Sequence, residues 1–358
     1  MSIFYPENAP EAVEWVQQTL ESGQPLVPAG LMNRLNSWPK AIDGSVKIIS
    51  SQKLNNMISV EPENLLAVAE AGMTPAQVRQ ALKPAGIYWP VSGLDGRSLG
   101  GIMAEGALGL ETMAKGQMTD WILGATFINP LGKEVSSGGR TLKNVSGYDL
   151  TRFQWRSWGT LGFSTRFILK CLPVPEASKV VELELSDAGK AVELSEKLIL
   201  QRISPQCIRL SLKNRQWKAL IWLAGFAEMV EAKVKKIKDL APEAKSLVHD
   251  EALDFWNEYL ASWPVEGGGQ SHYRGARRAV LELPPLLAEG RLNEAVSEAD
   301  LDVGGGQARF KWNSAQPEDF QWPASLRKVA PSGEGEVYGR LKKGLDPGNL
   351  FFPESLRP

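Results

Sequence analysis

Glycines at a helix start are the first residues in this chain whose type and spacing could do chemistry. The stretch reads Ser98-Leu99-Gly100-Gly101-Ile102, and Gly106 and Gly109 follow it. Glycine lets a ligand approach the backbone, and the free amides and positive dipole end of a helix N-terminus can hold a pyrophosphate. The same pattern is at least as typical of a tight turn with a purely structural role.

Two later stretches also stand out. One reads Lys143-Asn144-Val145-Ser146-Gly147-Tyr148-Asp149 and is followed by Gly159-Thr160-Leu161-Gly162, and the other reads Asp346-Pro347-Gly348-Asn349. Taken alone, the first predicts only a turn that leads into a strand, and Asp-Pro-Gly predicts only a turn. Together and in this order, the three stretches are far more specific than any one of them.

Histidines and cysteines are too few for a metal site, which needs at least three good ligands. The chain has two of each: His249, His272, Cys171 and Cys207. Both cysteines lie in apolar stretches, which favours buried free thiols in a reducing compartment over a disulfide. His272 follows three glycines and lies near Arg274, Arg277 and Arg278. This patch would suit a carboxylate or a partner, and a solvated loop is the alternative.

The elements that must position these stretches alternate between strands and helices in the first part of the chain. We expect a helix over residues 8–22, capped by Asn8 with Glu11 bonding back to it, and a second helix from Thr74-Pro75 to Leu82. Predicted strands cover residues 26–28, 47–51, 65–70, 121–129, 133–137 and 160–172. Pro173 and Pro175 then break regular structure, so the first predicted domain covers residues 1–172.

The pattern changes after residue 179. Candidates follow in the order β-α-β-β-α-β up to about residue 249, as a ferredoxin-like layer would produce. We expect a helix over 253–263, strands over 280–283 and 301–310 with a helix between them, and a loop over 313–335. The predicted fold class is therefore α+β, with a second domain over residues 173–330 and a C-terminal segment, residues 331–358, of helix and turn.

Composition is ordinary for a soluble globular protein of two domains: 358 residues, 43% hydrophobic and 23% charged. A net charge of -1 gives the surface as a whole no attraction for nucleic acid or an anionic membrane. No signal peptide is visible, and no window approaches ~18 apolar residues. We expect a cytoplasmic protein that reaches the inner face of a membrane only through partners.

The three stretches together resemble the vanillyl-alcohol-oxidase (PCMH) type of FAD-binding protein. The Ser-x-Gly-Gly start at residue 98, Asp120, the Lys-Asn-x-x-Gly-Tyr-Asp element, the Gly-Thr-Leu-Gly element and the terminal Lys…Asp-Pro…Pro occur at the family's spacing. The version Lys-Asn-Val-Ser-Gly-Tyr-Asp-Leu looks most like the small FAD-domain subunit of bacterial glycolate oxidase. The resemblance covers residues 1–172 and 338–358, and the middle domain matches mainly in length and position.

The resemblance implies a fold and a cofactor. Residues 1–172 would form a two-part PCMH-type FAD-binding domain, to which residues 331–358 return, and residues 173–330 a ferredoxin-like cap or substrate domain. The cofactor would be FAD, with its pyrophosphate and ribityl region near residues 98–109, its flavin near Asp120 and residues 144–149, and its adenosine half near residues 159–162. The residues assigned to FAD in this way are Gly30, Ser98, Gly100, Gly101, Gly109, Asp120, Asn144, Gly147, Tyr148, Asp149, Gly159 and Gly162. No catalytic residue and no metal ligand is assigned.

An activity and partners are implied as well. The chain would be the FAD-binding subunit of a glycolate oxidase-like complex, in which a 2-hydroxy acid passes hydride to the flavin and glycolate becomes glyoxylate. A larger paralogous flavoprotein subunit and an iron–sulfur subunit would complete the complex. The chain has too few cysteines for a cluster of its own.

Two departures from the family pattern favour an alternative, a degenerate paralogue with a structural or assembly role in the same complex. The family's first loop is glycine-rich, and its amides cradle the pyrophosphate. Here only Gly30 remains, and Leu31 and Met32 bring side chains to positions where the backbone should approach phosphate. Arg34 could supply a compensating charge. The histidine cluster of related 2-hydroxy-acid oxidases is also missing. A third possibility, a cell-wall reductase of the same superfamily, is disfavoured by the elements at residues 143–149 and 346–353.

Overall fold

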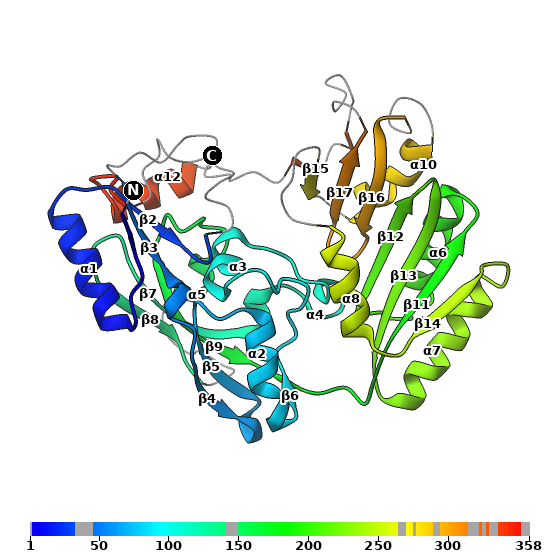
Figure 1. Cartoon of the computed structure of the whole chain (residues 1–358), viewed down its shortest axis with the longest axis horizontal. Coiled ribbons are helices and arrows are strands. Elements are labelled where there is room, and N and C mark those ends of the chain that lie inside the picture. Colours follow the sequence, from blue (N-terminus) through cyan, green and yellow to red (C-terminus); the bar gives the residue numbers. More distant parts are fainter. Residues whose placement is uncertain are drawn as a thin grey trace. The chain divides into compact units, whose positions relative to one another are not determined.

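The chain divides into two compact units. Unit 1 comprises Met1–Gly109, Gln117–Val174 and Ala330–Pro358, and unit 2 comprises Leu110–Gly116 and Pro175–Val329. The structure is a computed structural model, and it describes residues 2–32, 46–140, 149–263, 270–274, 277–288, 294–313, 322–323, 327–328 and 336–351 (Figure 1). Each unit has its own sheets and its own apolar core.

A five-stranded antiparallel sheet forms the larger layer of unit 1, in the order β4-β5-β9-β7-β8. Its strands are β4 (Met57–Glu61), β5 (Leu66–Glu70), β7 (Ile122–Ile128), β8 (Glu134–Gly138) and β9 (Phe163–Lys170). Helices α2 (Pro75–Leu82) and α3 (Leu99–Glu105) pack their apolar residues against it. Side chains of β9 alternate between buried and less buried positions, as expected when one face of a strand meets the core. The predicted helix at Thr74-Pro75 is confirmed, with a capping box between Thr74 and Gln77.

A smaller parallel sheet, in the order β1-β3-β2, forms the other layer of unit 1. It contains β1 (Ser2–Phe4), β2 (Leu26–Ala29) and β3 (Lys47–Ser50), and α1 (Ala9–Glu21) packs beside it. Asn8 caps α1 as predicted, accepting from the Glu11 amide at 3.0 Å. The Glu11 carboxylate, however, accepts from the Glu7 amide at 2.7 Å, so the predicted bond back to Asn8 is wrong.

Shorter elements connect these layers. They are η2 (Ser51–Lys53), η3 (Pro62–Asn64), η4 (Lys83–Ala85), β6 (Ile87–Tyr88), η5 (Met118–Trp121), α5 (Leu150–Phe153) and β10 (Leu172–Pro173). Near the C-terminus, α12 (Glu336–Leu345) is followed by a turn, and Phe351 then forms a parallel bridge with Leu26 beside the small sheet.

Unit 2 holds an eight-stranded antiparallel sheet in the order β14-β11-β13-β12-β16-β17-β15-β18. Its first elements are β11 (Ala177–Leu185), α6 (Ala188–Leu200), β12 (Cys207–Lys213), β13 (Gln216–Gly225), α7 (Ala227–Leu240) and β14 (Ser246–His249). They follow the chain as β-α-β-β-α-β, and their spatial order β14-β11-β13-β12 is that of a ferredoxin-like layer. The predicted arrangement is confirmed here.

The second half of unit 2 departs from prediction. The strand expected over residues 280–283 is wrong, because helices α9 (Arg277–Leu281) and α10 (Leu283–Ala288) lie there. The strand expected over residues 301–310 is two strands, β16 (Val296–Asp302) and β17 (Gln307–Trp312), joined by a turn at the glycines 304–306. The helix predicted over 253–263 is α8 (Ala252–Ala261). Strands β15 (Gln270–Arg274) and β18 (Arg327–Lys328) and helix α4 (Thr112–Lys115) were not predicted.

The two faces of the unit 2 sheet differ in chemistry. Residues such as Ile208 and Leu210 pack with α6, α7 and α10 in the main core. The residues that alternate with them, Cys207 and Arg209, point to the other face. There α8 and a smaller apolar cluster around Trp256 meet a group of buried charges.

Candidate cofactor site in unit 1 and a charge cluster in unit 2

Three residues predicted to contact FAD come together in unit 1, although they are far apart in the sequence. Gly30 follows β2, Ser98 caps α3, and Gly101 lies in the first turn of that helix. A Cβ built on Gly30 would overlap the Ser98 Oγ and lie 3.7 Å from the Gly101 Cα. The Ser50 hydroxyl also donates to the Gly30 carbonyl at 2.8 Å. Only glycine at position 30 therefore allows β2 to end against the start of α3.

Gly159 joins this group from a turn that precedes β9. A Cβ on Gly159 would lie 3.4 Å from the Pro28 Cβ in β2, and its φ of 76° is left-handed. The neighbouring Trp158 is also left-handed, and its amide donates to the Ala104 carbonyl of α3 at 2.8 Å. The turn is thereby fixed to both β2 and α3. We call Gly30, Ser98, Gly101 and Gly159 the glycine surface.

Amides at the start of α3 are already used within the protein. They donate from Leu99 to the Met73 carbonyl (2.8 Å), from Gly100 to the Ala71 carbonyl (2.8 Å) and from Gly101 to the Ser98 Oγ (3.1 Å). The expectation of free amides at this helix start is therefore wrong. The close approach of Gly100 to Ala71, where a Cβ would lie 3.4 Å from the Ala71 Cβ, serves helix–sheet packing.

The backbone after β2 behaves differently. Met32 has a φ of 59°, a left-handed conformation that glycine adopts readily and that costs other residues about 1–2 kcal/mol. No acceptor among the described residues takes a hydrogen bond from the amides of Leu31 or Met32. The loop after β2 therefore has a backbone conformation that favours glycine, although the residue at that position is Met32. Arg34 lies outside the described residues.

Gly109 and Gly162 have structural reasons to be glycine. A Cβ on Gly109 would lie 2.8 Å from the Ser92 carbonyl oxygen, and one on Gly162 would lie 2.9 Å from the Phe127 ring. Both positions are closed by protein atoms on that side. Their contact with FAD stays a prediction.

Asp120 and Asp149 meet through Arg152. The Arg152 guanidinium lies 3.6 Å from the Asp120 carboxylate and 3.2 Å from that of Asp149, and Asp149 also caps α5 by accepting from the Arg152 amide at 3.1 Å. All three side chains are about half exposed. The structure thus brings together two of the residues predicted to lie around the flavin. Asn144, Gly147 and Tyr148 lie outside the described residues.

These observations fit a dinucleotide held against backbone. Within the glycine surface, a Cβ on Gly101 would meet only the Ser98 Oγ, and the amides of Leu31 and Met32, which follow Gly30, have no acceptor among the described residues. Amides in left-handed turns form concave anion sites of the kind that hold phosphate groups. The hydrogen-bond donors that suit a pyrophosphate are therefore the amides of the loop after β2, whereas the amides at the start of α3 already donate to protein acceptors.

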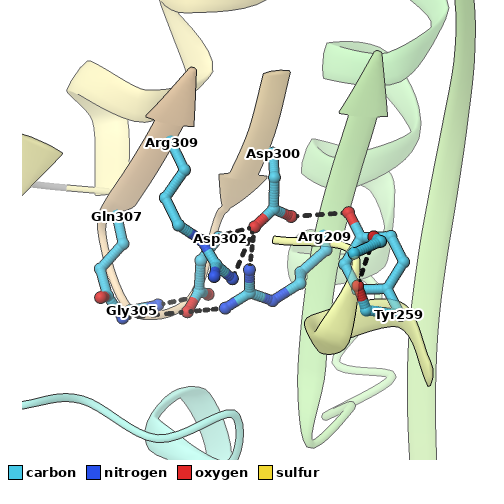
Figure 2. Close-up of polar contacts among 8 residues, drawn as sticks. Arg209, Tyr259, Asp300, Asp302, Gly305, Gln307 and Arg309 are labelled. Carbon is cyan, nitrogen blue, oxygen red and sulfur yellow. Dashed lines mark hydrogen bonds and ion pairs between the residues drawn. The ribbon is translucent and has the colours of Figure 1, made fainter. Parts of the chain in front are cut away.

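Unit 2 contains a buried charge cluster that sequence reasoning missed (Figure 2). Asp300 accepts from Arg309 (2.9 Å to Nε and 2.8 Å to Nη2), from the Tyr259 hydroxyl (2.8 Å) and from Arg209. Asp302 accepts from the Gly305 amide at 2.8 Å and lies 3.4 Å from Arg209 Nη2. We call Arg209, Tyr259, Asp300, Asp302 and Arg309 the charge cluster. The sequence pattern that could have indicated this cluster is the alternation of charged residues along two neighbouring strands, at positions 298, 300 and 302 and at positions 309 and 311.

The two aspartates of the charge cluster differ in electrostatics. Burial acts to raise the pKa of Asp300, but the charges of Arg209 and Arg309 and the Tyr259 hydrogen bond outweigh it, and the pKa lies below its ordinary value. Burial raises the pKa of Asp302, and Arg209 opposes this only in part. Asp300 is therefore a firmly ionised centre, and Asp302 is the carboxyl that takes up a proton first. Asp300 draws donors from β12, β17 and α8, which suits a structural anchor.

The two histidines do not meet in a site. His249 contacts the Glu182 carboxylate at 3.1 Å and lies 4.4 Å from the Phe255 ring. His272 lies in β15, and its backbone pairs with that of Arg309. Among the described residues, no three metal-binding side chains gather into a possible metal site. No helix in the described ranges is long and apolar enough to cross a membrane.

Comparison with known proteins adds the following. Residues 2–138 match the family model described as FAD binding domain. The chain is 29% identical over 363 residues to glycolate oxidase subunit GlcE of Escherichia coli, covering 95% of both chains. It is 27% identical over 206 residues to glycolate oxidase subunit GlcD of Bacillus subtilis, covering 57% of this chain but only 44% of GlcD. It is 29% identical over 319 residues to a D-lactate dehydrogenase of Archaeoglobus fulgidus, covering 86% of this chain and 68% of that protein.

Solved structures agree on the fold. An alkyldihydroxyacetonephosphate synthase superposes with a TM-score of 0.77 over 98% of this chain and 75% of that protein, at 14% identity. The α+β fold class and the resemblance are thus confirmed, and the family match together with the relatives indicates FAD as the cofactor. Residues 2–138 therefore match an FAD binding domain, and the chain as a whole is similar to FAD-linked oxidoreductases, glycolate oxidase subunit GlcE among them.

Proposed function

We propose that this chain is the FAD-binding subunit of a complex that oxidises a small 2-hydroxy acid, with glycolate as the candidate substrate. The observation that carries the proposal is the similarity to GlcE over 95% of both chains, whereas the chain spans only 44% of GlcD. GlcE is therefore a relative that this chain matches over nearly the full length of both proteins. When bound, FAD supplies the hydride acceptor for such an oxidation.

The proposal assigns roles to the chain's own residues. The glycine surface and the amides of Leu31 and Met32 hold the pyrophosphate, since packing leaves Gly101 nearly open there and these two amides have no acceptor among the described residues. Asp120 and Asp149, tied together by Arg152, lie toward the flavin. The other family-assigned positions, Asn144, Gly147 and Tyr148 among them, complete the proposed set.

The proposed partners would supply the iron–sulfur cluster, for which this chain has too few cysteines. Its two cysteines are both buried and lie in different units, Cys171 in unit 1 and Cys207 in unit 2. An iron–sulfur cluster needs several cysteine ligands within reach of one another. We therefore place the onward electron path in a larger paralogous flavoprotein subunit and an iron–sulfur subunit. The complex would work in the cytoplasm, at the inner face of the membrane through these partners.

A second candidate function is a degenerate paralogue that supports the same complex without binding FAD. Two observations favour it. The start of α3 has no amide left for a phosphate among its first three residues, and the β2 loop carries Met32 in a backbone conformation that suits glycine. In that case the fold and the partner surface would be retained for assembly alone.

Visible spectra distinguish the two candidates. We would purify the chain alone and together with the products of its neighbouring genes. The proposal expects flavin absorption in the lone chain, release of FAD on denaturation, and bleaching of the flavin by glycolate in the complex. A colourless lone chain that co-purifies with a yellow, glycolate-oxidising partner would contradict FAD binding and leave the assembly role.

A further inference from the structure

A buried lysine near the C-terminus links parts of unit 1 that lie far apart in the sequence. Lys342 of α12 is only 2% exposed. Its ammonium donates to the Thr160 carbonyl at 3.3 Å, to the Asp346 carboxylate and to the Phe351 carbonyl. A lysine is almost never buried unless its charge is paired, so these contacts define one specific arrangement.

Asp346 completes the arrangement by ordering the turn that follows α12. Its carboxylate accepts from the amides of Leu350 at 3.0 Å and Phe351 at 2.9 Å. The Leu350 carbonyl in turn accepts from the Leu26 amide at 2.7 Å, and the Phe351 side chain is fully buried in the core around α1 and β2. We call Lys342, Asp346, Leu350 and Phe351 the C-terminal clamp.

The clamp holds the two segments that carry the glycine surface. Through Leu26 it fixes the start of β2, the strand that ends at Gly30 and the Leu31–Met32 loop. Through the Thr160 carbonyl it fixes the turn that presents Gly159 to β2. Nothing in the clamp itself belongs to the glycine surface. It can therefore act on a bound cofactor only through the positions of these two segments.

We propose that the C-terminal clamp positions the FAD site, with Lys342 as its central positioning residue. This inference rests on the proposed FAD binding in unit 1. If FAD binds the arrangement in which the β2 loop and the Gly159 turn are held together, then docking of the C-terminal segment and binding of FAD favour each other. Binding of FAD must then also stabilise the docked C-terminal segment.

The first test compares FAD affinities by fluorescence titration of the apoprotein. The variant is the double substitution Lys342→Met with Asp346→Asn, which removes the ion pair without leaving one buried charge behind. We expect its Kd for FAD to rise about tenfold or more. Lys343→Met, at an exposed position of the same helix, should leave the Kd unchanged. Val78→Ala, a cavity in α2 away from the clamp, controls for a general loss of stability.

The outcomes separate this inference from the proposed function. A wild-type chain that takes up no FAD overturns both. A wild-type chain that binds FAD, with a folded double variant of equal affinity, overturns the clamp alone, as does an equal loss of affinity in Val78→Ala.

A second measurement uses the wild type and decides the question even if the double variant fails to fold. Hydrogen exchange of the peptide that contains Leu350 and Phe351 should slow when FAD is added. An unchanged exchange rate in a chain that binds FAD overturns the inference.

Discussion

At the scale of single residues, four of the glycines predicted to contact FAD differ in what packing requires of them. Gly30, Gly109 and Gly162 have protein atoms where a Cβ would lie, so packing alone requires them. Gly101 differs, because a Cβ there would meet only the Ser98 Oγ, at 3.1 Å. Alanine at position 101 would stabilise the helix by up to about 1 kcal/mol relative to glycine. Since packing gives little reason for glycine there, contact with a ligand is the better explanation.

The first prediction concerns Gly101→Ala. We expect the free energy of unfolding of the variant to stay within about 1 kcal/mol of the wild type, because helix propensity offsets the close contact with Ser98. Its Kd for FAD should rise about tenfold, which corresponds to about 1.4 kcal/mol, because the methyl group covers the glycine surface. Urea unfolding and fluorescence titration measure the two quantities. Gly96→Ala, where a Cβ would meet nothing within 4 Å, is the matched control. Equal FAD affinity in Gly101→Ala would remove this glycine from the site.

The second prediction concerns the two thiols. Burial raises the pKa of Cys171 to about 12 and that of Cys207 well above its ordinary value. The thiolate is the reactive form, so neither thiol should react with a disulfide reagent at pH 8 while the protein is folded. In denaturant, both cysteines should react. Rapid reaction of either thiol in the native protein would show that its surroundings open far more readily than the structure implies. Apolar neighbours in the sequence were enough to predict burial of both cysteines, and the structure confirms it.

Local hydrogen bonds mark the limit of prediction at this scale. The caps Asn8 and Thr74 follow from residue type and spacing, and both are confirmed. The hydrogen-bond partner of the Glu11 carboxylate does not follow from residue type and spacing, because this carboxylate can reach more than one amide. The path of the chain before α1, which brings in the Glu7 amide, decides between them.

At the scale of elements, prediction succeeded where the hydrophobic period was clear and failed for short apolar runs. The hairpin β7–β8 and the strand β9 lie where alternation and turn residues placed them. A short run such as Val280–Leu283 fits a strand or a buried helix equally well, and in the structure it belongs to α9 and α10. The glycines 304–306 mark the turn of a hairpin, which a single strand over residues 301–310 overlooked.

The charge cluster also depends on how elements pack together, because its residues come from β12, β16, β17 and α8. No sequence pattern states that Arg209 will lie between two aspartates from another strand. That contact depends on the antiparallel pairing of Arg209 with Asp302, which sequence reasoning did not resolve. The result is a polar group of fixed geometry on one face of a sheet whose other face is apolar.

The third prediction compares Asp300→Asn with Asp302→Asn. Asp300→Asn should lower the free energy of unfolding at pH 7 by about 3 kcal/mol or more, because it leaves the partly buried Arg309 without its anion and the buried Arg209 with Asp302 alone. Asp302→Asn should leave stability unchanged or raise it, since the substitution removes a carboxyl whose ionised form burial disfavours. Urea unfolding at several pH values measures both.

The pH dependence of each variant follows from the direction of the pKa shift. The pKa of Asp300 is lowered on folding, so its contribution is present above the unfolded value near 3.8 and is lost as the pH falls through the folded value. The pKa of Asp302 is raised, so its ionisation costs free energy above the folded value, and any gain from Asp302→Asn should shrink as the pH falls through it. Equal destabilisation by both variants at pH 7 would contradict the division of roles.

At the scale of the whole molecule, the order of motifs carried most of the functional information. The three stretches around residues 98, 149 and 346 are weak signals singly, yet their order pointed to FAD, and the family match and the relatives agree. The sequence did not predict which contacts these three stretches make in the folded protein. The terminal Asp-Pro element turned out to be part of a clamp on β2, and the start of α3 turned out to be saturated with protein acceptors.

The fourth prediction maps FAD onto the whole chain by hydrogen exchange with and without the cofactor. A ligand stabilises the parts of a protein that it binds, by about 2.7 kcal/mol at a concentration of 100 times Kd. Because every proposed FAD residue lies in unit 1, we expect the largest protection in β2, in the turn around Gly159 and in the C-terminal clamp. The strands β12, β16 and β17 of unit 2 should change least, and their exchange should respond to Asp300→Asn instead. If the strongest protection fell in unit 2, the glycine surface would not be the main FAD contact, and the assignment of the cofactor to unit 1 would have to be abandoned.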